Sequence, residues 1–288
     1  MQAHSGPVVA SRGDLTAIDC AVCGHAHLWP MPDLPADYYA SDFWQREKSG
    51  WLARYEEQRD WLDATNGDWL SVLSAHVSGT TILDVGCGWG FFIMAANDMG
   101  WTAYGIEPSA AAVQYIHRHS LLPVHAGGYE DYRGGEYSAI SALWLMEHLP
   151  DPLSFLRWCR SHLRPDGALL LAVPNEFTWQ QREAGQAAAV KGYWLHETHI
   201  NYWSAATFAN LLGRAGFRIV DRLGTFEMET FISLGMDYTA NEAMGAGAHA
   251  KVRADELALN RGQRIVQGRA RGQIGAGRDM VIVAKAGI

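Results

Sequence analysis

The fold is decided by the stretch Thr80-Thr81-Ile82-Leu83-Asp84-Val85-Gly86-Cys87-Gly88-Trp89-Gly90-Phe91-Phe92. Its apolar, β-favouring start predicts a strand, its three alternating glycines predict a tight turn, and the residues that follow predict a helix. Gly86 and Gly88 lack Cβ atoms and tolerate positive φ angles, so N–H groups at the helix start can face a polar ligand. The stretch therefore predicts a strand–loop–helix unit that binds a nucleotide.

Two ligand classes compete for this loop. The dinucleotide-binding fingerprint carries a glycine where this chain has Phe91, which disfavours an NAD-dependent oxidoreductase. The spacing Gly86-x-Gly88-x-Gly90 after Leu83-Asp84-Val85 closely resembles the first motif of the class I S-adenosylmethionine (SAM) methyltransferases. The resemblance implies SAM as the cofactor, with its methionine end over the three glycines. A glycine-rich turn without any ligand is the remaining alternative.

Glu107 ends the next predicted strand, which begins at Trp101. It lies close to 20 residues beyond the glycines, where an acid can accept hydrogen bonds from both ribose hydroxyls of a nucleoside. This arrangement serves SAM as well as NAD, so it predicts a ribose site without choosing between them. A surface glutamate at a strand end is the plain alternative.

The predicted strand 137–145 runs into Met146-Glu147-His148-Leu149-Pro150-Asp151-Pro152. This string resembles the motif after the fourth strand of many SAM-dependent methyltransferases. Ubiquinone-pathway members hold a divalent metal with a further glutamate, and Trp144 occupies that position, so no catalytic metal is expected. Trp144 could instead face the SAM sulfonium through a cation–π contact, and Asp84 could assist the loop electrostatically. Core packing and turn capping explain both residues equally well.

Cys20 and Cys23 form half of a zinc site, with His25 and His27 close by in the sequence. Together with the Pro-rich link at 30–32, they resemble the N-terminal zinc ribbon of some bacterial methyltransferases, including sugar methyltransferases. That ribbon has a second cysteine pair, and this chain has none. The sequence therefore favours a metal-free, degenerate segment.

Alternating strands and helices predict an α/β fold with a Rossmann-like, seven-stranded, mostly parallel sheet and helices on both faces. Residues 1–78 are expected to form an N-terminal extension, poorly ordered up to about residue 18 unless tied down, and helical over 37–77. Residues 79–288 are expected to form the SAM-binding domain. Within it, the insertion 225–278 exceeds a hairpin loop and is expected to be a lid, a homodimer surface or both. One helix is predicted in this insertion, over 254–271.

Charge and composition limit the classes of partner and the cellular location that are expected. The formal charge of −8 disfavours nucleic acid as a partner, because nucleic-acid-binding surfaces are usually basic. No apolar run approaches the roughly 20 residues of a membrane span, and no export signal is evident. The four cysteines do not form a secreted disulfide pattern. These features predict a cytoplasmic enzyme with a small-molecule substrate.

Three histidines are candidates for the base that removes a proton from the methyl acceptor: His148, His196 and His199. The last two lie in an aromatic-rich segment, 176–203, and are slightly preferred. The leading hypothesis is methyl transfer from SAM to oxygen or carbon of a sugar nucleotide, a glycan or a secondary metabolite. A non-catalytic nucleotide-binding or sensing protein on the same fold is the main alternative.

Overall fold

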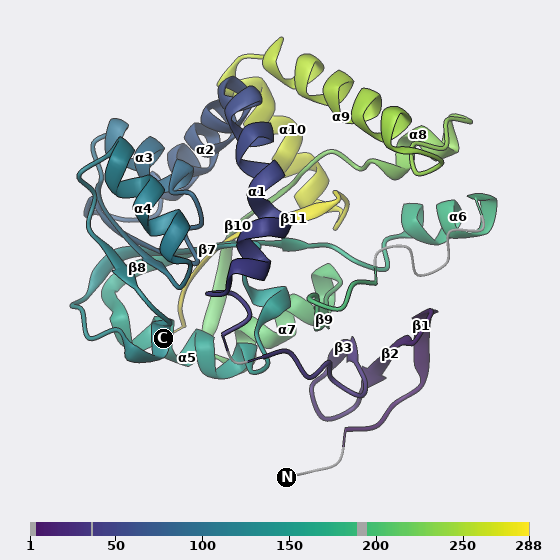
Figure 1. Cartoon of the computed structure of the whole chain (residues 1–288), viewed down its shortest axis with the longest axis horizontal. Helices are drawn as coiled ribbons and strands as arrows, with labels where there is room; N and C mark the ends of the chain where they lie inside the picture. Colours follow the sequence, from purple (N-terminus) through teal and green to yellow (C-terminus); the bar gives the residue numbers. More distant parts are fainter. Residues whose placement is uncertain (1–3, 36, 189–194, 288) are drawn as a thin grey trace.

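The computed structural model describes residues 4–35, 37–188 and 195–287, without the side chains of residues 42–49 and 184–188. Two β-sheets with helices around the larger one make up this part of the chain (Figure 1). The smaller sheet lies to one side of the larger sheet (Figure 1).

The larger sheet has seven strands in the order β10-β11-β8-β7-β4-β5-β6. Its strands are β4 (Thr81–Val85), β5 (Thr102–Glu107), β6 (Val124–Ala126), β7 (Tyr137–Leu143), β8 (Leu163–Pro174), β10 (Phe217–Gly224) and β11 (Asp279–Ala286). Strand β11 is antiparallel to both of its neighbours, and the other recorded pairs are parallel. The predicted seven-stranded, mostly parallel α/β fold is confirmed. Because β4, β5 and β7 are parallel, the segments that follow them meet at one edge of the sheet.

Helices pack on both faces of this sheet. The helices of the described residues are α1 (Asp42–Glu57), α2 (Arg59–Ser74), α3 (Phe91–Asp98), α4 (Ala110–His119), α5 (Pro152–His162), α6 (Trp179–Ala188), α7 (Ala205–Arg214), α8 (Glu229–Ser233), α9 (Glu242–Leu257) and α10 (Arg261–Gln273). On one face, Phe155 of α5 and Phe208 of α7 are fully buried against the strands. On the other face, Leu70 and Leu73 of α2 pack with Ile93 of α3. Helix α2 thus belongs to the core that supports the glycine loop.

The N-terminal segment forms a second sheet, and this pairing ties down the described residues up to 18, for which poor order was expected otherwise. Its strands, in sheet order, are β1 (Val8–Arg12), β2 (Leu15–Cys20), β3 (His25–Leu28) and β9 (Asn201–Tyr202). Backbone pairing needs no large side chains, and Ala17, Leu28 and Tyr202 are buried around this sheet. The distant β9 therefore ties the N-terminal segment to the loop after β8.

The insertion 225–278 contains helices α8, α9 and α10, whereas the sequence predicted one helix over 254–271. Asn260 breaks that helix: its side chain accepts a hydrogen bond from the Gln263 N–H, and the Gln263 side chain accepts one from the Asn260 N–H. Helix α10 packs on α2 and β10 (Figure 1). A lid or a dimer surface remains a prediction for this insertion. In the described ranges, every helix is too short or too polar to cross a lipid bilayer.

Candidate active site

The glycine loop between β4 and α3 has the backbone that its sequence predicts. The φ angles of Gly86, Gly88 and Gly90 are 72°, 51° and 80°, a region that residues with a Cβ rarely occupy. A Cβ on Gly90 would lie 2.6 Å from a side-chain carbon of Ile116, whereas one on Gly88 would meet no atom within 4 Å. Gly90 therefore permits close packing of α3 and α4. Gly88 faces open space in front of the loop.

Glu107 lies at the end of β5, beside this loop. Its two carboxylate oxygens accept hydrogen bonds from the Gly88 N–H (2.8 Å) and the Ser109 N–H (2.9 Å). Burial raises the pKa of Glu107, and these two N–H groups oppose the rise. Because a carboxylate offers about four lone-pair sites, the two oxygens can still accept from ribose hydroxyls. Glu107, the residue predicted to bind the ribose, is thus hydrogen-bonded to the predicted glycine loop.

Asp84 lies below the loop, within β4, and is 2% exposed. The Ser141 hydroxyl donates to its carboxylate at 2.7 Å. The pKa of Asp84 is raised to about 7, because burial and, to a lesser extent, the nearby charge of Glu107 raise it more than the Ser141 hydrogen bond lowers it. Asp84 is therefore a core residue beneath the loop. Any effect it has on a ligand would be a long-range electrostatic one rather than a direct contact.

Trp144 follows β7 with a φ of +52°, which is uncommon for a residue other than glycine. Its indole N–H donates to Asp279 at 3.1 Å, and its ring lies 5.5 Å from that of Trp69. It is 41% exposed and lines a cavity of about 210 Å³ between α2, α9, α10 and the start of β11. The predicted cofactor residue thus stands in the wall of a largely apolar cavity, whose lining includes no residue of the glycine loop.

Phe91, the residue that replaces the third fingerprint glycine, begins α3 and is buried. The Tyr55 ring of α1 lies 5.7 Å from its ring, and the Arg59 guanidinium of α2 stands 5.1 Å above it. Helices α1 and α2 therefore pack against the start of α3, directly after the glycine loop.

The structure brings the three candidate histidines together: His148 follows β7, and His196 and His199 lie in the segment after β8. The His148 ring lies 4.8 Å from that of His199, which lies 5.9 Å from that of His196. His148 Nδ1 is 2.7 Å from the Thr198 carbonyl oxygen, which can only accept. Nδ1 therefore carries the hydrogen, and neutral His148 has its lone pair on Nε2. Of the three, His196 is the exposed one, and its Nδ1 is 2.8 Å from the hydroxyl of the neighbouring Thr198.

Two further groups complete this cluster. Glu147 is buried, and its carboxylate lies within 4.8 Å of the ligating nitrogens of His148 and His199. The Tyr39 ring, 5.6 Å from His148, is a site residue that sequence reasoning missed, and burial raises its pKa. The cluster has the donor types of a divalent-metal site as well as those of a proton-transfer site. The absence of a catalytic metal remains a prediction.

The aromatic residues of 176–203 do not act as one group. Tyr202 and Trp203 are buried in the two cores, and Trp179 is 65% exposed on α6. Tyr193 and Trp194 lie outside the described residues. The acceptor side of the site therefore rests on the histidine cluster rather than on a general aromatic lining.

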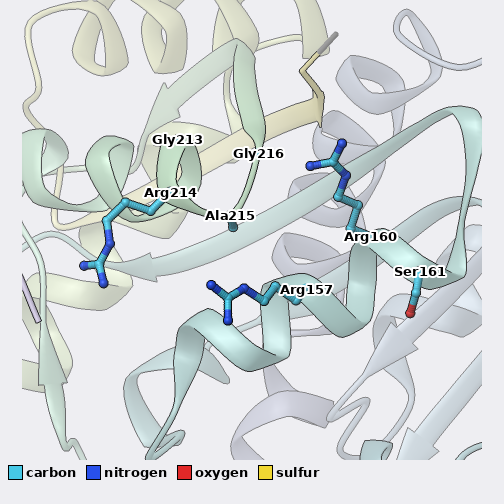
Figure 2. Close-up of a pocket in the computed structure, with 7 residues that line it drawn as sticks. All are labelled: Arg157, Arg160, Ser161, Gly213, Arg214, Ala215 and Gly216. Carbon is cyan, nitrogen blue, oxygen red and sulfur yellow. The ribbon is translucent and has the colours of Figure 1, made fainter.

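A basic pocket of about 430 Å³ lies elsewhere, between the ends of α5 and α7. Figure 2 shows Arg157 and Arg160 of α5 and Arg214 of α7 around it. These helix ends lead into the starts of β8 and β10, so the pocket lies at the opposite edge of the sheet from the glycine loop. It is not part of the candidate active site.

The fold and the loop define the class first. A mostly parallel sheet with a glycine loop after its first strand in the chain, an acid at the end of the next and an antiparallel strand beside β8 is the class I SAM-dependent methyltransferase arrangement that the sequence predicted. Residues 55–222, more than half of the chain, match the family described as methyltransferase domain. The chain belongs to this family. SAM is the cofactor of its class.

Relatives with assigned functions match the central part of the chain. The ubiquinone biosynthesis O-methyltransferase of Xanthomonas campestris is 32% identical over 124 residues, covering 40% of this chain and 52% of its own. The enzyme of the same name from Haemophilus ducreyi is 30% identical over 126 residues, covering 40% and 53%. The chain thus spans about half the length of the curated relatives it matches.

Solved structures support the fold alone. A methyltransferase in complex with the Haloferax volcanii Trm112 methyltransferase activator superposes with a TM-score of 0.52 at 16% identity, covering 85% of this chain and 97% of that chain. Magnesium protoporphyrin IX methyltransferase from Synechocystis, with bound S-adenosylhomocysteine (SAH), gives 0.51 at 18% identity, covering 66% and 91%.

Proposed function

We propose that this protein transfers a methyl group from SAM to an oxygen or carbon atom of a small-molecule acceptor. One observation carries the proposal: the glycine loop, Glu107 and the His148–His199 pair all follow parallel strands that end at the same edge of the sheet. A methyl donor and an acceptor with its proton-removing group must meet at one place, and this edge provides it.

On the cofactor side, Gly88 and Glu107 would hold the nucleoside. Gly88 leaves space in front of the loop, and the Glu107 carboxylate can accept from both ribose hydroxyls. Trp144, partly exposed in the cavity wall, would face the sulfonium or the acceptor with its π-system. Phe91 fills the position where a dinucleotide-binding loop needs glycine, which speaks against an NAD-dependent oxidoreductase.

On the acceptor side, His148 is the base that the geometry favours. Thr198 fixes its tautomer with the lone pair on Nε2, and His199 lies beside it. Attack by an acceptor hydroxyl breaks the carbon–sulfur bond, forms the carbon–oxygen bond and releases a proton that His148 or His199 can accept. His196 is the weaker candidate because it is exposed and already contacts Thr198.

The acceptor class follows from the relatives and from the cavity. The curated relatives are O-methyltransferases of ubiquinone biosynthesis, and the cavity beside Trp144 is largely apolar with a few charged side chains. A flat or sugar-like acceptor suits such a wall. Sugar nucleotides, glycans and hydroxylated secondary metabolites are therefore the acceptors to test.

The test is methyl transfer with SAM that carries a deuterated methyl group, over a panel of sugar nucleotides and phenols, read by mass spectrometry. With an accepted substrate, His148→Gln and His199→Gln should lower kcat by roughly 10²- to 10⁴-fold with unchanged SAM affinity. His117→Gln, an exposed histidine on α4, is the matched control. SAM binding without turnover on the panel would favour the non-catalytic alternative, and full activity in both variants would remove the histidines from the mechanism.

A further inference from the structure

Four metal-ligating side chains converge at the edge of the smaller sheet. The sulfur and nitrogen donors of His4, Cys20, Cys23 and His27 all lie within 4.8 Å of one another. We propose that they bind one zinc ion in a closed, structural site with two cysteine and two histidine ligands. Sequence alone favoured a metal-free segment because a second cysteine pair is missing, whereas the fold supplies His4 from the residues before β1.

The distances between the donors match a tetrahedron around zinc. With zinc–sulfur bonds of about 2.3 Å and zinc–nitrogen bonds of about 2.05 Å, the edges are about 3.3 Å between nitrogens and about 3.5 Å between nitrogen and sulfur. His4 Nδ1 lies 3.1 Å from His27 Nε2, 3.4 Å from Cys23 Sγ and 3.6 Å from Cys20 Sγ. Three of the six donor–donor distances thus already match the tetrahedron with the side chains in their present rotamers.

Zinc binding explains why these side chains converge better than hydrogen bonding among them does. His4 Nδ1 can donate one hydrogen at most, yet it approaches three acceptor atoms. His27 Nδ1 lies 2.8 Å from the Leu28 carbonyl oxygen, so it carries the hydrogen, and His27 Nε2 directs its lone pair at the cluster. A ligating histidine typically has its other ring nitrogen held by a carbonyl or carboxylate in this way.

The backbone holds His4 at this place. The β1–β2 pairing continues toward the N-terminus through hydrogen bonds from the Asp19 N–H to the Pro7 carbonyl and from the Ala21 N–H to the Ser5 carbonyl. Gly6 allows the two chains to come close, because a Cβ there would lie 1.8 Å from the Asp19 carbonyl oxygen. His4 is therefore positioned by the sheet and not by a chance contact of a loose terminus.

The surroundings suit a structural ion. Cys20 is 1% exposed and His27 fully buried, and the Trp29 ring lies 4.9 Å from the His4 ring. Neither Cys20 nor Cys23 is in a disulfide. Four protein ligands leave no position for a substrate, which is the mark of a structural rather than a catalytic zinc site.

The site would also stabilise the loop that carries the acceptor-side histidines. His27 pairs with Asn201 in the β3–β9 ladder, and the Asn201 side chain donates to the carbonyls of Leu149 (2.7 Å) and Met146 (3.3 Å). Asn201 thus lies between the cluster and the segment that contains His148. This link to the active site rests on the proposed function, whereas zinc binding itself does not.

The test is elemental analysis of the full-length chain purified under reducing conditions and then given zinc and dialysed. We expect about one zinc per chain, retained against a weak chelator, and less than about a tenth of that in His4→Gln and Cys23→Ser. Cys159→Ala and His25→Gln are matched controls that should keep the ion, because Cys159 lies in the main core and His25 bonds to Asn201. Cobalt(II) in place of zinc should give the visible spectrum of a tetrahedral thiolate site.

A second measurement does not depend on the variants folding. In zinc-loaded wild-type protein, Cys20 and Cys23 should resist alkylation, and a strong chelator should expose both. Chelation should also raise hydrogen exchange over 195–203 while SAH affinity stays unchanged. A wild-type protein that retains no zinc, a Cys20–Cys23 disulfide under reducing conditions, or full zinc content in both ligand variants would overturn the site. If the protein binds zinc but chelation leaves hydrogen exchange over 195–203 unchanged, only the link to the active site would be overturned.

Discussion

The glycine loop lets two helices pack closely and is proposed to bind a ligand, and two alanine substitutions can separate these two roles. Gly88→Ala and Gly90→Ala both force a Cβ into a positive-φ conformation, at a cost of about 1–2 kcal/mol. At Gly90 the new methyl also lies 2.6 Å from a carbon of the buried Ile116, and overpacking adds about 1–3 kcal/mol. At Gly88 it meets no protein atom within 4 Å.

Gly90→Ala should therefore lose more stability than Gly88→Ala, whereas Gly88→Ala should lose more ligand affinity. Urea unfolding should show Gly90→Ala less stable than Gly88→Ala by about 1–3 kcal/mol. Calorimetric titration with SAH should show at least about a tenfold loss of affinity in Gly88→Ala, a change of 1.4 kcal/mol, because its methyl occupies the space in front of the loop.

Gly100→Ala is the matched control. Gly100 has a φ of +88° and also has open space at its Cβ position, but it lies in the turn after α3, away from the loop. It should show the conformational cost alone and bind SAH like the wild type. Wild-type affinity in Gly88→Ala, or equal stability of Gly90→Ala and Gly100→Ala, would refute this account of the loop.

Two further predictions concern buried carboxylates. Burial raises the pKa of Asp84 from 3.8 to about 7, so the folded chain keeps a proton that the unfolded chain releases, and wild-type stability should fall as the pH rises from about 4 to about 7. Asp84→Asn should remove this loss, gaining up to about 4 kcal/mol relative to wild type between pH 4 and 8 in urea unfolding, and parallel pH curves would count against it. Asp68→Asn should cost about 1.5–3 kcal/mol because it removes the carboxylate charge and one of the two acceptor oxygens in the hydrogen bonds, 2.6 and 2.9 Å, that join α2 to Arg264 of α10. Asp63→Asn, which breaks an exposed pair with Arg59, should cost less than about 1 kcal/mol, and equal losses in the two variants would show that the α2–α10 link has no special weight.

The local parts of the fold and site could be predicted from the sequence. The strand–glycine–helix pattern and the acid at 107 depend on residues near one another in the chain, and the structure places Glu107 against Gly88 as one unit. The apolar runs similarly give the seven strands of the larger sheet. Such features follow from backbone conformation and periodicity, which a short window of sequence records.

The long-range parts could not be predicted. Strand β9 has only two residues and pairs with β3 across more than 170 positions, so no local pattern marks it. His4 joins Cys20 and Cys23 only because the β1–β2 pairing extends beyond the strands. The break at Asn260 was different, because its capping pattern with Gln263 is visible in the sequence.

The central claim is that the loop and Glu107 bind the adenosyl part of SAM. Isothermal titration calorimetry with SAH and, separately, with NAD tests it most directly, using wild type, Glu107→Gln and the exposed control Glu136→Gln. The account predicts one SAH per chain, no measurable NAD binding, wild-type affinity in Glu136→Gln and at least about a tenfold weaker SAH affinity in Glu107→Gln. NAD bound in preference to SAH, or SAH bound equally well by Glu107→Gln and wild type, would contradict it.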